Sequence, residues 1–398
     1  TFAELKDLSE PKLHLLFLPK WYPNRIDPFD GNFVENHAHA ISKYANVTVL
    51  FVHSDEKASK TYEIEQKNNG LLNEVRCYFK KPKCSIGWLN KLLTAFRYIK
   101  AQQLAYNYIK NEKVSKFDLL HIHVLSRTAI FALWLKSQLK VPLGITEHWS
   151  GYLPESSQYK GKLKKWITEK AVKSASFVSC VSPYLRDSMI NHDLQNNYKI
   201  VPNVVDCELF KPIDRLPTSK IQILFVGNLL QSPKRILDII SVFAKISQRR
   251  KDFILNIYGE GKDETVCKEL ILQHRLENVV KLKGTRSRAE IAQIMAKSDF
   301  LFLFSEFENQ PCVINEAQAC GLPVVVPDIP GILAFMEDEL GLVFPRLNKA
   351  AFEEAILQMM DNYSRYNSQN IRNFALENFS EEVIGQQFVS LYKAAIND

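Results

Sequence analysis

The chain has 398 residues, of which 46% are hydrophobic and 24% charged, and only 14 are glycine and 17 proline. This composition excludes disordered, collagen-like and low-complexity proteins, and the length predicts two or three domains. Seven cysteines without a C-x-x-C pair exclude a disulfide scaffold and a cysteine zinc site. Because this cysteine usage fits a reducing compartment, we expect a cytoplasmic protein.

The sequence shows no feature of a membrane span or a secretory leader. No apolar run reaches the roughly 18 residues that cross a bilayer. The segment Thr1 to Pro11 is polar and acidic, whereas a secretory leader is basic and then apolar. We therefore expect neither element in this sequence.

The net charge of +7 is unevenly distributed. Residues 1–206 contain 29 basic and 19 acidic side chains, a net +10, whereas residues 207–398 contain 22 and 25, a net −3. Such asymmetry predicts an anionic partner for the first half: a nucleic acid, an acidic membrane surface or a phosphorylated substrate. Charge alone leaves these three open.

The first half alternates short apolar runs with amphipathic stretches, which predicts a doubly wound parallel α/β sheet. The clearest helix has apolar residues at three- and four-residue spacing from Trp88 to Ile99, with Lys91, Arg97 and Lys100 on its other faces. The predicted strands are Leu13–Leu18, Val47–Val52, Leu119–Val124, Leu143–Thr146 and Phe177–Val181.

A polar, proline-bearing segment from Asn203 to Lys220 reads as a linker, and the alternation then restarts. The second set of strands is Ile221–Val226, Phe253–Tyr258, Val279–Leu282, Phe300–Phe304 and Pro323–Val326. We expect Rossmann-like domains at residues 1–206 and 207–380. The last helix, about residues 381–398, is expected to pack back on the first domain.

Two glutamates follow the strand Phe300–Phe304. Glu308 lies in the loop, and Glu316 lies inside a helix that Pro311 is expected to open at its first position. Ligands of open parallel sheets bind beyond the carboxyl ends of strands. The free amides at such a helix start favour an anion, for example a diphosphate. The alternative is a pair of solvated glutamates.

Glu308-x7-Glu316, followed by Gly321-x-Pro323-Val324, closely resembles the donor-site element of retaining GT-B glycosyltransferases of family 4, group 1 type. The resemblance implies two Rossmann-like domains facing a cleft. It also implies that Glu308 orients the donor sugar through its hydroxyls and that Glu316 binds the ribose. Gln310, Cys312 and Val313 belong to the same donor-binding element.

Other positions extend the resemblance along the chain. Lys234 stands where the family has a pyrophosphate-binding lysine. Asn228 occupies the place of the usual arginine, and Arg235 that of a glycine. Thr285 and Arg286 lie in the loop that the family places near the nucleotide base. With Asn228 in place of the arginine, the family's pair of cations for the diphosphate is incomplete. In one interpretation, the Arg235 side chain partly substitutes for the missing arginine.

Two further positions of the resemblance fall in the first half. Gly31 matches the second glycine of the family's glycine-rich loop, near the donor diphosphate, with a plain turn glycine as the alternative. His148, at a strand end, matches the histidine that contacts the transferred sugar. His121 and His123 alternate on an apolar strand, and we interpret them as core or cleft residues.

The resemblance implies transfer of a hexose from a nucleotide-diphosphate sugar to a hydroxyl of a glycan or lipid-linked acceptor, with retention, in glycan or polysaccharide biosynthesis. The expected catalytic residues are His148, Lys234 and Glu308. We find no metal-ligand motif and expect neither a metal nor a cofactor. The alternatives are a sugar-nucleotide-binding protein without transfer activity and a GT-B epimerase.

Other classes receive no support. The sequence has neither a complete G-x-G-x-x-G loop nor a Walker Gly-Lys-Ser/Thr loop, and no basic-aromatic module for nucleic acid. The basic stretches Lys80–Lys83 and Lys160–Trp166 have two interpretations: a solvated face, or docking to the inner, anionic face of a membrane.

Overall fold

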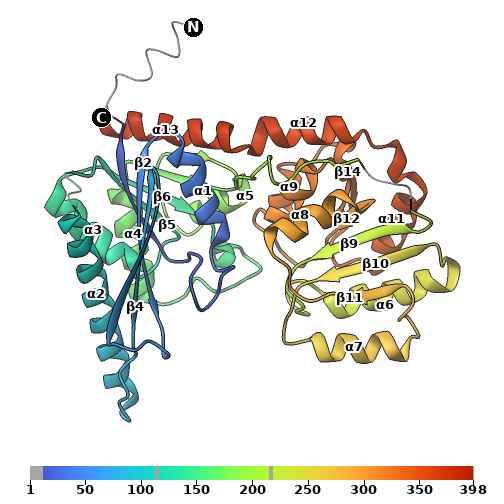
Figure 1. Cartoon of the computed structure of the whole chain (residues 1–398), viewed down its shortest axis with the longest axis horizontal. Coiled ribbons are helices and arrows are strands. Elements are labelled where there is room, and N and C mark those ends of the chain that lie inside the picture. The colour runs from blue at the N-terminus through green and yellow to red at the C-terminus, as the bar shows by residue number, and fades with distance from the viewer. Residues whose placement is uncertain (1–11, 113–115, 215–217, 398) are drawn as a thin grey trace, which may run out of the picture. The chain divides into compact units, whose positions relative to one another are not determined.

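The computed structural model describes residues 12–112, 116–214 and 218–397, which form two compact units (Figure 1). Unit 1 contains the residues up to Asn203 together with those from Ile384 onward, and unit 2 is Val204–Val383. Thr1–Pro11, examined above for a leader, and Pro217 of the expected linker lie outside the described residues. No described helix has the length and apolar character that crossing a bilayer requires.

Unit 1 is built on an eight-stranded sheet in the order β3-β4-β2-β1-β5-β6-β7-β8. All neighbours are parallel except β3 and β4, so the sheet is mixed rather than wholly parallel. The strands are β1 (His14–Pro19), β2 (Asn46–Ser54), β3 (Tyr62–Asn69), β4 (Leu72–Phe79), β5 (Leu119–His123), β6 (Leu143–Glu147), β7 (Phe177–Cys180) and β8 (Tyr198–Ile200).

The helices of unit 1 are α1 (Asn32–Ser42), α2 (Gly87–Asn111), α3 (Thr128–Leu139), η1 (Ser150–Tyr152), α4 (Lys162–Ser174), α5 (Pro183–Ile190) and, from Ile384, α13 (Glu381–Asn397). Helix α13 packs on the strands of unit 1 through buried Phe388 and Tyr392. The Tyr392 hydroxyl lies 2.8 Å from Nδ1 of His121. The end of the chain is therefore part of the first unit's core.

The apolar stripe in the first half of helix α2 is exposed rather than packed on the core. An apolar stripe at helical spacing normally packs on a core. Here Trp88, Leu92, Phe96 and Ile99 are 66%, 59%, 64% and 43% exposed, and only the second half of the helix is buried.

Unit 2 is built on a parallel six-stranded sheet in the order β11-β10-β9-β12-β13-β14. Its strands are β9 (Ile221–Val226), β10 (Phe253–Tyr258), β11 (Val280–Leu282), β12 (Phe300–Phe302), β13 (Val324–Pro327) and β14 (Gly341–Phe344). Its helices are α6 (Ile236–Arg249), α7 (Glu264–Gln273), α8 (Arg288–Ala296), α9 (Cys312–Ala319), α10 (Pro330–Leu333), η2 (Asp338–Leu340), α11 (Lys349–Asn362), η3 (Tyr363–Arg365) and α12 (Ser368–Phe379).

The described part of the expected linker is packed. Cys207 and Phe210 belong to the hydrophobic core of unit 2. The Arg372 guanidinium donates to the carbonyls of Phe210 and Cys207, at 3.0 Å each. Asn203 ends unit 1 and Val204 begins unit 2, close to the expected boundary after Asp206.

Candidate active site

The loops at the carboxyl edge of the unit 2 sheet meet at its switch point. Strand β9 lies between β10 and β12, and the chain leaves β9 and β12 in loops that run toward α6 and α9. Such a point is where open α/β sheets bind ligands. Gly259 has φ +135°, and a Cβ there would meet the Gly227 carbonyl oxygen at 2.0 Å. Only glycine lets the loop after β10, which begins with Gly259, pack so closely on the loop after β9.

An ion pair joins the two loops at this point. Lys234 Nζ lies 2.5 Å from Glu308 Oε1, and both side chains are largely buried, at 18% and 14% exposure. The Ser305 hydroxyl donates to the same carboxylate oxygen at 2.7 Å. The structure therefore brings together two residues that are far apart in the sequence and were both expected in the site. Glu308 is held in place from two sides.

Arg235 is occupied by neighbouring acids. Its guanidinium lies 2.9 Å from Glu306 and 2.6 Å from Asp238. Glu306 also accepts from the Ser232 hydroxyl at 2.7 Å. Arg235 has φ +56° at the N-cap of α6, in the place where the family has glycine. A second cation for a diphosphate would have to come from a side chain already paired twice.

Helix α9 begins one residue later than expected. Pro311 is its N-cap, with ψ 115°, and Cys312 is its first residue. Glu316 lies one turn further on. Burial raises the pKa of the Glu316 carboxyl, and nearby Arg288 opposes this shift. The start of α9 therefore combines the positive end of a helix dipole with a partly desolvated acid.

The remaining expected donor residues lie around the same edge. Asn228 is exposed after β9, and Val313 is half-buried in the first turn of α9. Gln310 is buried, at 6% exposure. Thr285 and Arg286 follow Gly284, whose carbonyl accepts from Gly259 N at 3.1 Å.

In unit 1, Gly31 and His148 lie near the corresponding switch point, between β1 and β5. Gly31 has φ +65°, and a Cβ there would lie 2.3 Å from the Trp21 backbone. No other residue fits without movement of that loop. The next helix, α1, carries Phe33, whose ring centroid lies 4.5 Å from that of His148.

Two family profiles match the chain: "Glycosyltransferase Family 4" over residues 32–209 and "Glycosyl transferases group 1" over residues 207–375. The chain is a family 4 glycosyltransferase of the group 1 type. An uncharacterised glycosyltransferase of Methanocaldococcus jannaschii is 26% identical over 265 residues, which is 66% of this chain and 70% of that one.

Solved structures show the same fold. Sucrose-phosphate synthase of Thermosynechococcus elongatus has a TM-score of 0.77 at 16% identity, covering 97% of this chain and all of the other. The Anabaena protein HepE, solved with UDP, has a TM-score of 0.68 at 18% identity, covering 96% of this chain and all of the other. The expected GT-B architecture of two Rossmann-like domains is confirmed.

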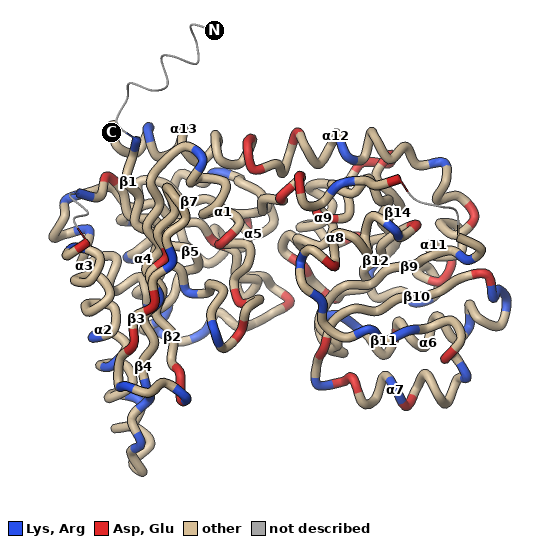
Figure 2. The backbone as a smooth tube through the Cα atoms, in the orientation of Figure 1, with Lys and Arg blue, Asp and Glu red and all other residues tan. Residues whose placement is uncertain are grey.

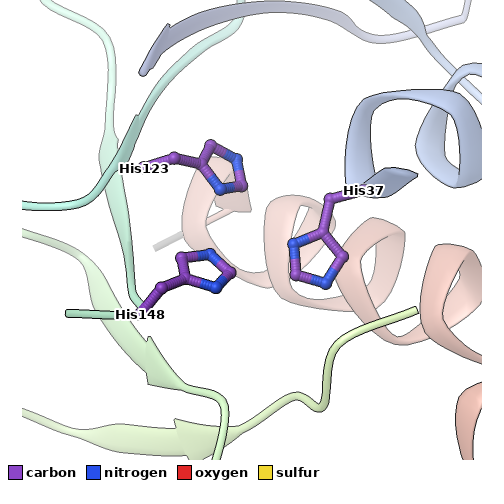
Figure 3. Close-up of side chains that lie close together, drawn as sticks. All are labelled: His37, His123 and His148. Atoms are coloured by element: carbon purple, nitrogen blue, oxygen red, sulfur yellow. The ribbon is translucent and has the colours of Figure 1, made fainter. Parts of the chain in front are cut away.

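Three histidines of this glycosyltransferase come together in unit 1: His37 of α1, His123 of β5 and His148 after β6 (Figure 3). They are separated by tens of residues in the sequence, so no motif revealed them. Each offers a ring nitrogen within 4.8 Å of the others. Nδ1 of His148 lies 3.2 Å from the Asn203 side-chain oxygen, and Nε2 of His37 lies 3.1 Å from the Pro202 carbonyl. Among described residues, this histidine trio is the group with a metal-compatible spacing.

The imidazoles of the trio are held neutral. Burial lowers the pKa of His37 to about 4, and it lowers the pKa values of His123 and His148 well below their usual range. His121, beside them, is shifted in the same direction. Neutral rings suit packing against Phe17 and Phe388, which contact them.

These shifts predict acid sensitivity of the fold. Unfolded histidines bind protons below about pH 6.5, whereas the buried ones do not until the pH is far lower. Their contribution to stability is therefore complete above about pH 6.5. It is lost as the pH falls, by up to about 1.4 kcal/mol per pH unit for each imidazole. We expect the urea midpoint to fall between pH 7 and pH 5.

The variant His123→Phe isolates the trio in this experiment. Burial raises the pKa values of the half-buried Glu35 carboxyl and of the fully buried Glu147 carboxyl, so these two groups act in the opposite direction. Comparing the slope of unfolding free energy against pH in the variant and the wild type removes their contribution. The slope should be shallower in His123→Phe. An identical slope would show that this imidazole does not titrate on unfolding as described.

Sequence reasoning missed the groups that support the site. Ser305 and Glu306 hold Glu308 and Arg235, and their position after β12 was the available signal. Glu147 is fully buried and accepts from the backbone amides of Leu125, His148 and Trp149, at 2.9 Å each. It fixes the loop that carries His148. Nothing in the sequence distinguished this glutamate from a solvent-exposed one.

Proposed function

We propose that this family 4 glycosyltransferase moves a hexose from a nucleotide-diphosphate sugar to an acceptor hydroxyl with retention of anomeric configuration. The contact between Lys234 and Glu308, beside the start of α9, is the observation that carries the proposal. A cation for the diphosphate and a carboxylate for sugar hydroxyls then lie next to each other. HepE was solved with UDP, which supports a nucleotide ligand for this chain as well.

The reaction requires charge stabilisation more than proton transfer by the protein. The bond between the anomeric carbon and the leaving phosphate oxygen breaks, and the acceptor oxygen bonds to the same face of that carbon. The acceptor proton goes to the leaving diphosphate, so no enzymatic nucleophile is needed. Negative charge accumulates on the phosphate, and preorganised donors stabilise it most effectively. Lys234 and the backbone amides of Gln310 and Cys312 supply such donors, whereas Pro311 has no amide hydrogen.

The other candidate residues are proposed to bind the sugar and the nucleoside of the donor. Glu308 orients the sugar hydroxyls, and Glu316 binds the ribose hydroxyls. His148 contacts the transferred sugar, for which a neutral imidazole can accept or donate one hydrogen bond. Asn228, Thr285 and Arg286 complete the donor-binding set at the sheet edge.

The test is incubation of the purified protein with UDP-, GDP- and ADP-sugars and a panel of glycan and lipid-linked acceptors. The account expects one donor to be consumed with formation of an α-linked product from an α-linked donor, read by NMR. Nucleotide binding without transfer or hydrolysis would favour the binding protein instead. Conversion of the donor without an acceptor would favour the epimerase.

We also propose that transfer needs no metal ion, because Lys234 and helix amides face the diphosphate. Chelation with EDTA followed by gel filtration is expected to leave turnover unchanged. Metal analysis of the same sample provides the control. Loss of turnover on chelation, with recovery on adding Mg²⁺ or Zn²⁺, would contradict this assignment. Recovery with Zn²⁺ alone would direct attention to the histidine trio, since neutral imidazoles are zinc ligands.

We propose the class of acceptor from the positive charge of the first half of the chain. Its basic excess and the lysines around Trp166 favour an acceptor at an anionic surface, and a glycan carried by a lipid on the inner membrane face meets that condition.

A further inference from the structure

The first half of α2 presents a row of large apolar side chains to solvent. Trp88, Leu92, Phe96 and Ile99 follow one another at spacings of four, four and three residues, so they share one side of the helix. All four are more than 40% exposed. Isolated exposed apolar residues are common in soluble proteins, but a row on one helix face marks an interaction surface. We call these four residues the α2 face.

The opposite side of α2 is anchored to unit 1, so the α2 face is available for a partner. Ala101, Ala105 and Ile109 are fully buried in the second half of the helix. In the first half, the Arg97 guanidinium donates to the Lys80 carbonyl at 2.7 Å. The Tyr98 ring lies 5.5 Å from the Arg127 guanidinium of α3. Figure 1 shows the first turns of α2 projecting past the strands of unit 1.

The sequence leading into and along α2 carries charge of one sign, and Glu56 from another segment lies 3.8 Å from one of its lysines, Lys81. Residues 75–111 contain eight lysines and arginines and no aspartate or glutamate. Lys81, Lys83, Lys91 and Lys100 are exposed. In Figure 2 the tube before and along the start of α2 is tan with separate blue stretches, which are these basic residues. A partner must therefore cover apolar side chains and also bring negative charge.

We propose that the α2 face docks on an anionic lipid bilayer, with its apolar side chains in the boundary between headgroups and acyl chains. A tryptophan near the helix start, long aliphatic residues and flanking lysines are the composition of helices that lie in such an interface. A second copy of the chain fits less well. A twofold contact through the same face would place the lysines of one copy against those of the other.

The inference rests on the proposed function only for its purpose, which is to bring the enzyme to an acceptor carried by a lipid. Docking itself requires no donor and no turnover. Helix α3, whose Phe131 ring contacts that of Tyr106 in the second half of α2, also has exposed apolar residues, Ile130 and Trp134.

The experiment measures co-sedimentation of the full chain with vesicles of phosphatidylcholine, with and without phosphatidylglycerol. We expect binding to the anionic vesicles only, and weakening as salt is raised. The variant Trp88→Ser/Phe96→Ser should bind roughly tenfold or more weakly, because it removes the two largest apolar groups of the α2 face. Lys91→Glu/Lys100→Glu should also bind at least about tenfold more weakly.

A matched control variant separates vesicle binding by the α2 face from non-specific adsorption of exposed apolar residues. Leu272 of α7 in unit 2 is 62% exposed, and Leu272→Ser should bind vesicles like the wild type. Circular dichroism and nucleotide affinity of each variant show that it is folded and that the donor site is intact.

Three outcomes would overturn the inference. They are a folded wild type that does not bind anionic vesicles, α2 variants that bind as tightly as the wild type, and a dimer in sedimentation velocity that the α2 variants dissociate. In each case, nucleotide binding measured on the same samples tells whether the proposed transferase function still stands. Vesicle binding without nucleotide binding would instead contradict the function and leave docking intact.

Discussion

Lys234→Ala is expected to lower kcat by about two to three orders of magnitude, the usual effect of removing one preorganised group that faces developing charge. Lys234 is the described cation in contact with Glu308 at the mouth of α9. Its loss removes the countercharge that the leaving diphosphate needs most when the glycosidic bond breaks. KM for the donor should change less than kcat, because the charge on the phosphate grows toward the transition state.

Two variants make this measurement specific. Lys245, exposed in the middle of α6, provides the matched control, and Lys245→Ala should keep wild-type kinetics. Lys234→Arg keeps the charge but changes its geometry, so partial activity is expected. Initial rates with the donor that the proposed screen selects, at saturating acceptor, give kcat and KM for each protein. Unchanged kcat in folded Lys234→Ala would remove the role assigned to this lysine.

Glu316→Ala is expected to weaken nucleotide binding by roughly 10- to 100-fold, because a carboxylate that accepts two ribose hydroxyls is worth about 1.5–3 kcal/mol. The free protein should lose little stability. Burial already raises the pKa of this carboxyl, so its charge is a cost in the unliganded fold. The variant should therefore have a melting temperature near that of the wild type and a much smaller shift when nucleotide is added.

Glu269 of α7 is exposed and gives a matched glutamate control, since Glu269→Ala should show the full nucleotide-induced shift. Isothermal titration with the free nucleoside diphosphate and with the nucleoside monophosphate separates ribose contacts from diphosphate contacts. Wild-type affinity in Glu316→Ala would show that the ribose lies elsewhere.

The strands were predictable wherever burial on both faces left a continuous apolar run. Every predicted strand, from Leu13–Leu18 to Pro323–Val326, overlaps an observed one. The β3–β4 hairpin was missed because β3 reads Tyr-Glu-Ile-Glu-Gln-Lys-Asn-Asn and is an exposed edge strand, paired on one side only. Pairing with β4, rather than its own apolar pattern, makes it a strand.

The positions of candidate site residues were predictable where a motif fixes their spacing in the sequence. They were not predictable where the fold brings distant residues together. Glu308 and Glu316 are eight residues apart, and the motif placed them in the loop after a strand and in the following helix, as observed. The histidine trio depends on the pairing of β1 with β5 and on α1, which no local pattern encodes. The exposure of the α2 face could not be predicted from the sequence either. Apolar periodicity identifies the apolar side of a helix, but it does not show whether another element covers that side.

A crystal structure with a bound, unreactive nucleotide-diphosphate sugar would show where the donor lies. We expect density for the diphosphate at the first turn of α9, within hydrogen-bond distance of Lys234 Nζ and the Cys312 amide, with the ribose hydroxyls on the Glu316 carboxylate. A nucleotide bound at any other edge of the sheet, with the Lys234–Glu308 pair untouched and Glu316 without a ligand contact, would contradict it.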